Sequence, residues 1–221
     1  MKKSFDQIQN SWLYRLSKAI GDVVIISGLF LLFCLPVVTI GASVTALYYT
    51  VYRKFNKKSD ELSKDFMRSI SDNLKNGVII HLIYLLYSAV VGFNIYFALF
   101  GLGGVKLPDW YVVVSFIPVL PIIFTLPFVY PLMARFSNGI KGTLTNSYTL
   151  CMINFPKFLL IWLILIVALA VSICFPPAAL VTPVGAMYLT QMITEKAFEK
   201  ALAVEKKREE KADESEVAVD G

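Results

Sequence analysis

Four long stretches without a single Asp, Glu, Lys or Arg dominate this chain and limit the folds that it can adopt. They are Val23 to Tyr52, Asn76 to Val105, Trp110 to Ala134 and Phe158 to Thr194. A helix needs about 20 apolar residues to cross a hydrocarbon core of about 30 Å, so each stretch is long enough to span a bilayer. With 57% hydrophobic and 17% charged residues, the chain is also too apolar for an ordinary soluble domain. These features predict an all-α, polytopic integral membrane helical bundle.

Proline residues divide these stretches into spans. Pro176 and Pro177 interrupt the last stretch, which is 37 residues long, and a proline pair cannot continue a helix. That stretch therefore predicts two spans, whereas the second and third stretches each predict one. The hydrophobic segments expected to enter the membrane are residues 20–52, 78–104, 110–134, 157–175 and 177–195.

The first of these segments leaves two topologies open. It is broken at Pro36 to Gly41 and can cross once as a long tilted helix or twice as a hairpin. Lys and Arg are retained on the cytoplasmic side of membranes. Two crossings place 20 of the 21 Lys and Arg residues inside, with only Lys106 outside, whereas one crossing places 16 inside. We therefore prefer the hairpin, with five to six transmembrane helices in total and with cytoplasmic N- and C-termini.

Two amphipathic segments flank the first hydrophobic segment, and both predict helices at the membrane surface. Residues 5–20 space their apolar side chains three or four residues apart, at Phe5, Ile8, Trp12, Leu16 and Ile20. Residues 53–77, a cytoplasmic elbow, repeat an apolar stripe that we expect to face the membrane surface or a partner, at Leu62, Phe66, Ile70 and Leu74. Residues 1–210 thus form a single membrane domain, and the acidic tail 211–221 is expected to be disordered.

A short internal similarity relates the two segments that contain proline breaks. The first contains CLPVVTIGASVTALYY and the last contains CFPPAALVTPVGAMYL, each with Cys, a Pro two residues later, a Val-Thr step and Gly-Ala. Two interpretations stay open for Pro36, Gly41, Pro183 and Gly185. Broken helices of this kind can bind a solute through freed backbone groups, as in transporters, or they simply allow tight turns and close helix packing.

The run LLFCLPVVTIGASVTALYYTVYRK resembles the hallmark segment of the YesL-like family of small bacterial membrane proteins, also described as domain of unknown function 624. The positions that carry the resemblance are Pro36, Thr39, Gly41, Ala42, Phe66, Asn73, Arg135 and Phe136. The chain departs from the family at Ser27, where Asn is frequent, and at Ile70 and Leu74, where Phe is expected. The resemblance extends over residues 10–205. It implies a bacterial plasma-membrane protein that is associated with carbohydrate uptake and has no assigned biochemical activity.

Motifs for catalysis and for cofactor binding are missing from the sequence. It contains no Walker A, Gly-x-Gly-x-x-Gly or Gly-x-Ser-x-Gly pattern, and a single His cannot make a zinc site. The four charge-free stretches lack the carboxylates with which ion-coupled carriers bind protons or sodium. We therefore expect no enzymatic activity, no catalytic or metal-binding residue, no cofactor and no nucleic-acid partner.

Two classes of function remain. The first is a non-enzymatic accessory or regulatory component of a sugar importer, which contacts its partner through the elbow and the loop from Arg135 to Lys157. The second is an independent channel or transporter for a small solute, formed by the two broken hairpins. The composition itself predicts only the lipid bilayer as a partner. The sugar importer follows from the resemblance, and the sequence leaves the substrate and the oligomeric state open.

Overall fold

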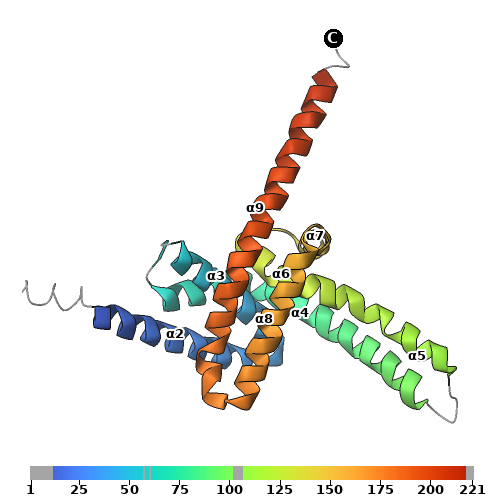
Figure 1. Cartoon of the computed structure of the whole chain (residues 1–221), viewed down its shortest axis with the longest axis horizontal. Helices are drawn as coiled ribbons and strands as arrows, with labels where there is room; N and C mark the ends of the chain where they lie inside the picture. Colours follow the sequence, from blue (N-terminus) through green and yellow to red (C-terminus); the bar gives the residue numbers. More distant parts are fainter. Residues whose placement is uncertain (1–11, 57, 60, 102–106, 218–221) are drawn as a thin grey trace, which may run out of the picture.

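The computed structural model describes residues 12–56, 58–59, 61–101 and 107–217. These residues are helical or lie in short connections and contain no strand, which confirms the all-α class (Figure 1). The α-helices and the short 3-10 helices (η) are α2 Trp12–Cys34, η1 Val37–Thr39, α3 Ile40–Phe55, α4 Leu62–Phe100, α5 Asp109–Ser115, η2 Ile117–Val119, α6 Leu120–Arg135, α7 Ile140–Ile153, α8 Phe155–Cys174, η3 Pro176–Leu180 and α9 Thr182–Val217.

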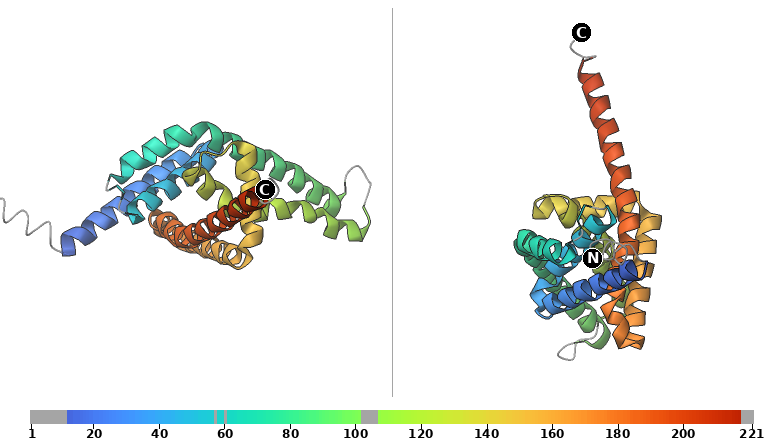
Figure 2. Two further views of the ribbon diagram at one scale, coloured as in Figure 1. Left: turned by 90° about the horizontal axis from the view of Figure 1, so that it is seen from above. Right: turned by 90° about the vertical axis from the view of Figure 1, so that its left-hand side faces the viewer.

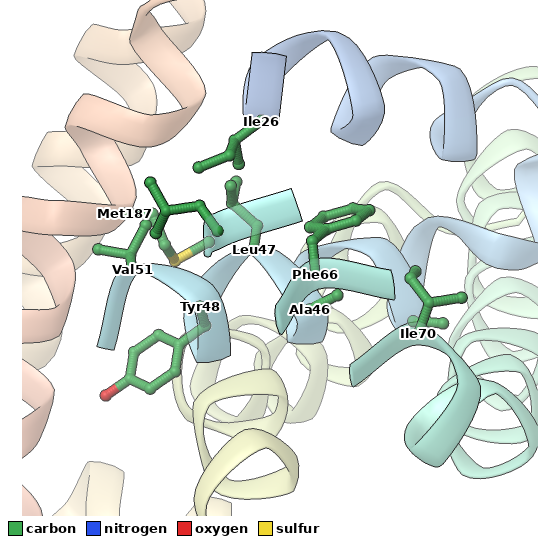
Figure 3. Close-up of a cluster of buried hydrophobic side chains, with 10 residues drawn as sticks. Ile26, Ala46, Leu47, Tyr48, Val51, Phe66, Ile70 and Met187 are labelled. Atoms are coloured by element: carbon green, nitrogen blue, oxygen red, sulfur yellow. The ribbon is translucent and has the colours of Figure 1, made fainter. Parts of the chain in front are cut away.

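Helix α3 lies at the centre of the fold and packs against α2, α4, α6 and α9. Its small residues let neighbouring helices approach, and its larger ones fill a core with side chains from three other helices (Figure 3). The labelled members of this core are Ile26 of α2, Ala46, Leu47, Tyr48 and Val51 of α3, Phe66 and Ile70 of α4, and Met187 of α9. A helix of only 16 residues thus contacts most of the longer ones.

The predicted break in the first hydrophobic segment is confirmed. Helix α2 ends at Cys34, and η1 and α3 follow after Pro36. The hydroxyl group of Thr39 bonds to the carbonyl oxygens of Phe33, at 2.5 Å, and Pro36, at 2.8 Å, and the Pro36 oxygen also accepts from the backbone N–H of Thr39 at 3.0 Å. Asp22 in the middle of α2 and Lys54 near the end of α3 form an ion pair of 3.6 Å, which places these two segments side by side. Helices α2 and α3 therefore run antiparallel as a hairpin.

Helix α4 differs from the prediction because it joins the elbow and the following span in one element of 39 residues. At 1.5 Å per residue it is about 58 Å long, roughly twice the thickness of a hydrocarbon core. Gly77, the predicted boundary, does not interrupt the helix, since a glycine costs a helix only about 1 kcal/mol. The first half of α4 packs along α3, and Tyr84 and Tyr87 in the second half bond to residues of the α5–α6 segment.

The apolar stripe of the elbow is buried inside the chain rather than facing the membrane surface or a partner. Leu62, Phe66 and Ile70 lie in the core around α3, and Phe66 is 0% exposed. The ring of Phe66 packs against that of Phe33 at a centroid distance of 5.9 Å. Only Leu74, at 41% exposure, stays on the surface. The predicted helical period of the stripe is confirmed, but the α2–α3 hairpin covers it instead of the membrane surface or a partner.

Both ends of the chain are more helical than predicted. Residues 12–20 are the first part of α2 and do not form a separate interfacial helix, while residues 5–11 lie outside the described residues. Helix α9 continues to Val217 and so includes residues 211–217 of the tail that we expected to be disordered. Ala, Glu and Lys, which favour helices, fill this region. Residues 205–217, called the stem below, stand clear of the other helices (Figures 1 and 2).

The outer surface of the bundle is apolar over most of its helices. Large exposed side chains, such as Leu32 of α2, Leu86 of α4, Val113 of α5 and Leu163 of α8, cover it. Among the described residues, four stretches are long and apolar enough to cross a membrane: Ser17–Cys34, Leu62–Phe100, Asp109–Arg135 and Phe155–Cys174. Water-soluble proteins rarely expose apolar surface on this scale. The fold is that of a membrane protein.

Candidate functional site

The glycine of the hallmark segment brings two helix backbones into contact. A Cβ atom added to Gly41 would lie 2.6 Å from the carbonyl oxygen of Gly77 and 2.9 Å from the Cβ of His81. Ala42 is fully buried against the same point of α4. Pro36 and Thr39 form the turn that precedes this crossing. The first four predicted site residues therefore set the hairpin turn and its closest approach to α4.

A polar cluster lies near the other end of α3, where that helix meets α6 and α9. It consists of Tyr48, Tyr52, Arg135, Thr194 and Glu195. The guanidinium group of Arg135 lies 2.8 Å from the Glu195 carboxylate and stacks over the Tyr52 ring at 4.2 Å. The Tyr48 hydroxyl donates to Glu195 at 2.9 Å and lies 2.7 Å from the Thr194 hydroxyl. The cluster thus ties three helices together through mostly buried charges and hydrogen bonds.

A second polar group joins α3 to the start of α4. Arg53 pairs with Asp65 at 3.3 Å and donates to the hydroxyl of Tyr49 at 3.1 Å. That hydrogen bond raises the pKa of Arg53, and the charge of Asp65 adds to the increase. Burial acts in the opposite direction and lowers the pKa. Lys58 donates to the hydroxyl of Tyr52 at 3.1 Å and so extends the group to the polar cluster. The end of the hallmark segment, YYTVYRK, therefore supplies most of the polar contacts of α3.

Three of the predicted site residues come together in one cleft. Asn73 of α4, Arg135 of α6 and the adjacent Phe136 line a pocket of about 340 Å³ with Asp72, Asn76 and residues 133–138. The amide of Asn73 donates to the Ser69 carbonyl oxygen of its own helix at 3.1 Å. Phe66 lies in the core instead, and the residues of the hairpin turn do not line this pocket.

The chain between Arg135 and Lys157, which we treated as a loop, contains the 14-residue helix α7. With the end of α6 and with α9 it forms a groove of about 510 Å³, called the α7–α9 groove below. Its lining is largely apolar and consists of Leu132, Phe136, Asn138, Asn146, Thr149, Leu150, Ile153, Phe198, Ala201, Leu202 and Val204. The ring of Phe136 packs edge-on against that of Phe198 at a centroid distance of 5.6 Å. Phe136 lines both this groove and the cleft of about 340 Å³.

Cys151 of α7 is fully buried in the apolar cluster that includes Phe158 and Phe198. Burial raises the pKa of the Cys151 thiol to about 11, which keeps it protonated and unreactive at neutral pH. Among the described residues, no group of three or more His, Cys, Asp and Glu side chains could hold a metal ion. In the polar cluster the charged side chains of Arg135 and Glu195 pair with each other, and Arg135 also lines the cleft of about 340 Å³.

Sequence reasoning missed four members of the polar cluster, Tyr48, Tyr52, Thr194 and Glu195. Tyr48 and Tyr52 belong to the hallmark segment, but nothing in a single sequence indicates which of its tyrosines turn toward other helices. Glu195 carries a usable signal, since it is the first charge after 37 uncharged residues. A carboxylate at the end of an apolar helix and an arginine at the end of another are natural partners.

The fold and these contacts define a helical membrane protein organised around one short central helix. Residues 23–102, which run from α2 to the end of α4, belong to the family described as "Protein of unknown function, DUF624". This match includes the break, the central helix and the glycine crossing, and confirms the family resemblance over this segment. Comparison of the chain with curated proteins and with solved structures found no match.

Removing Glu195 should measurably destabilise the fold. Glu195→Ala leaves Arg135 and Tyr48 without their shared acceptor. Both charged side chains are about one fifth exposed, so we expect a loss of roughly 2 kcal/mol, below the about 3–5 kcal/mol of a fully buried pair. The melting temperature in mild detergent should fall by about 5 °C. Asp72→Ala, which removes a carboxylate that is 65% exposed and pairs with the exposed Arg68, is the control and should leave the melting temperature nearly unchanged; equal melting temperatures for both variants would contradict a bracing role for the cluster.

Proposed function

We propose that this chain is a non-enzymatic, YesL-like integral membrane protein of the bacterial plasma membrane that serves as an accessory or regulatory component of another membrane complex. Its six membrane helices would be α2, α3, α4, the α5–α6 segment, α8 and α9. An even number of membrane helices places both termini on the same side of the membrane. The distribution of Lys and Arg predicts that this side is the cytoplasm. The ion pair between Asp22 and Lys54 supports this arrangement, because it places the start of the charge-free part of α2 beside the end of α3.

The single observation that carries the accessory role is the α7–α9 groove. It lies beside α7 and the part of α9 that leads into the stem, and of its lining only Leu132 belongs to the four apolar stretches that are long enough to cross a membrane. Ile153 and Leu202 are substantially exposed there. Apolar side chains that line a groove where lipid does not cover them mark a site for a protein partner. Asn138 and Asn146 add polar groups that can pair with a partner's backbone.

The occupant that fits this groove is an apolar helix face or loop of a partner membrane protein. The YesL-like resemblance is the support for placing that partner in carbohydrate uptake, with a sugar importer as the candidate. The elbow is no longer part of this surface, because its stripe is buried. The contact surface that we expected between Arg135 and Lys157 is retained, now as helix α7.

The alternative function, a small-solute channel, has less support from the hairpins. A channel of the broken-helix type needs backbone groups that are free to bind a solute. In the first hairpin Thr39 bonds to the carbonyl oxygens of the break. In the second, Thr182 donates to the carbonyl oxygen of Ala178 at 3.0 Å and contacts the Ser172 hydroxyl at 2.6 Å. In each turn a threonine hydroxyl therefore occupies carbonyl oxygens that a solute would need.

Changing the groove should remove the partner while leaving the fold intact. We expect a tagged wild-type chain, purified from native membranes in mild detergent, to bring a stoichiometric membrane partner that mass spectrometry identifies. Ile153→Glu places a charge in the groove and should lower this recovery about tenfold or more. Met152→Glu changes the neighbouring residue of α7, which is equally exposed but does not line the groove, and should retain the partner.

Two outcomes would overturn the proposal. If the wild-type chain is recovered only with itself, the accessory role fails and reconstituted flux assays become the test of the channel alternative. If Ile153→Glu and Met152→Glu both keep the partner, or both lose it equally, the partner does not bind in the groove. Melting temperatures of all three proteins show whether a loss comes from misfolding.

A further inference from the structure

Three lysines gather where α8 and α9 meet, on a surface that neither the polar cluster nor the groove uses. Lys157 lies in the first turn of α8, and Lys196 and Lys200 are one turn apart on α9. The neighbouring side chains Phe158 and Phe198 pack in one apolar cluster, which holds these helix segments together. The charges of Lys196 and Lys200 act on Lys157, with Glu199 as the opposing charge nearby. We call this group the lysine cluster.

The charges that act on Lys157 are predominantly positive. They are those of the ammonium groups of Lys196 and Lys200 and of one carboxylate, that of Glu199. Like charges held within range of each other cost free energy, which an external anion would offset. Fixed lysines of this kind point to a ligand with a compact negative group, and an ammonium group binds phosphate as a point charge.

The first turns of α8 also expose large apolar side chains, of which Leu160 lies on the side of the helix nearest to Lys157. Phe155, Leu159, Leu160 and Leu163 are all exposed. They belong to a helix that is apolar and long enough to cross a membrane and that begins at Phe155. The lysines therefore stand at the level where this helix enters the bilayer. A negative group on the lysines and acyl chains along the leucines is the arrangement of one amphiphile.

From this juxtaposition we propose that the lysine cluster and the adjoining outer face of α8 bind the headgroup and chains of an anionic phospholipid. The lysines hold the phosphate, and the exposed leucines pack against the first part of an acyl chain. The site is independent of the partner groove, which opens on other residues of α9. A lipid bound there would clamp the start of α8 to α9, the helix that also supplies Glu195 and the stem.

Native mass spectrometry of the full chain tests this site directly. The protein is exchanged into nanodiscs that contain equal amounts of phosphatidylglycerol and phosphatidylcholine, and the lipids retained after release are counted. We expect wild-type protein to retain phosphatidylglycerol preferentially. The triple variant Lys157→Gln, Lys196→Gln, Lys200→Gln should lose this preference about tenfold or more. The matched control is the triple variant Lys64→Gln, Lys75→Gln, Lys141→Gln, which removes the same charge from exposed positions elsewhere. This control should retain the preference for phosphatidylglycerol.

Three results would overturn the proposal. Equal retention of the two lipids by wild-type protein would show no selection for a negative headgroup. Equal losses in the two triple variants would assign the preference to overall charge and not to this cluster. Inorganic phosphate that raises the melting temperature as much as phosphatidylglycerol does would make the site one for a free anion. Melting temperatures of both variants in phosphatidylcholine alone show whether they are folded.

Discussion

Replacing Gly77 with leucine is expected to abolish the folded protein. A Cβ atom at Gly77 would already lie 2.8 Å from the Cα and 2.9 Å from the backbone nitrogen of Ala42. These are backbone atoms of the central helix, so they cannot move without separating α3 from α4. The cost should therefore exceed the about 1–3 kcal/mol that an extra group usually imposes on a packed core. We expect no monodisperse peak in size-exclusion chromatography of a fluorescent fusion.

The control for this prediction lies in the same helix. Gly92 has open space around its backbone, so Gly92→Leu should elute like wild type and keep its melting temperature within about 2 °C. Gly77→Ala should be intermediate, because it adds one atom where leucine adds four. A wild-type profile for Gly77→Leu would show that the two backbones are not in contact.

The contrast between a packed and an unpacked glycine also decides how a loss of solute flux in a glycine variant must be interpreted. The internal similarity aligns Gly41 with Gly185, but only Gly41 is packed against another backbone, whereas Gly185 has open space. A bulky residue at Gly41 should remove activity through misfolding, whatever the activity is. A bulky residue at Gly185 should leave the fold intact, so loss of flux there, in folded protein, would be evidence for a channel.

The parts of the fold that a single sequence predicts are those that depend on local chemistry. The breaks at Pro36 and at Pro176 were both predicted because proline removes a helix hydrogen bond wherever it occurs. The apolar stretches were predicted because the bilayer requires about 20 apolar residues for each helix. Helix α7 was missed since its buried face carries Thr143 and Ser147, polar residues that hide the apolar period.

What could not be predicted is which faces pack against each other. The stripe through Phe66 has the same period whether lipid, a partner or the chain itself covers it, and only the position of the α2–α3 hairpin decides. The same limit on predicting which faces pack together applies to the candidate site. The resemblance identified Asn73, Arg135 and Phe136, which do meet at one cleft, but Glu195, the partner of Arg135, comes from a helix 60 residues further along the chain.

Phe66→Asp should likewise remove the folded protein and not merely a partner. The side chain is fully buried between α2 and α3 (Figure 3), and a carboxylate there would have neither water nor a cation to stabilise it. Phe66→Ala should cost about 3–5 kcal/mol through the cavity that it leaves, which lowers the melting temperature by about 10 °C. Leu74→Asp, at the exposed end of the same stripe, should change the melting temperature little.

These variants also separate stability from binding, which matters because a buried and an exposed stripe look alike in a sequence. If α4 contacts a partner through this stripe, Phe66→Ala should lose the partner while its melting temperature stays at the wild-type value. If the stripe is core, stability falls first, and the protein that remains folded should recover the partner at the wild-type ratio. The second result is the one expected from the contacts of Phe66 with Phe33 and the α3 core. It would leave the α7–α9 groove as the surface on which partner binding has to be tested.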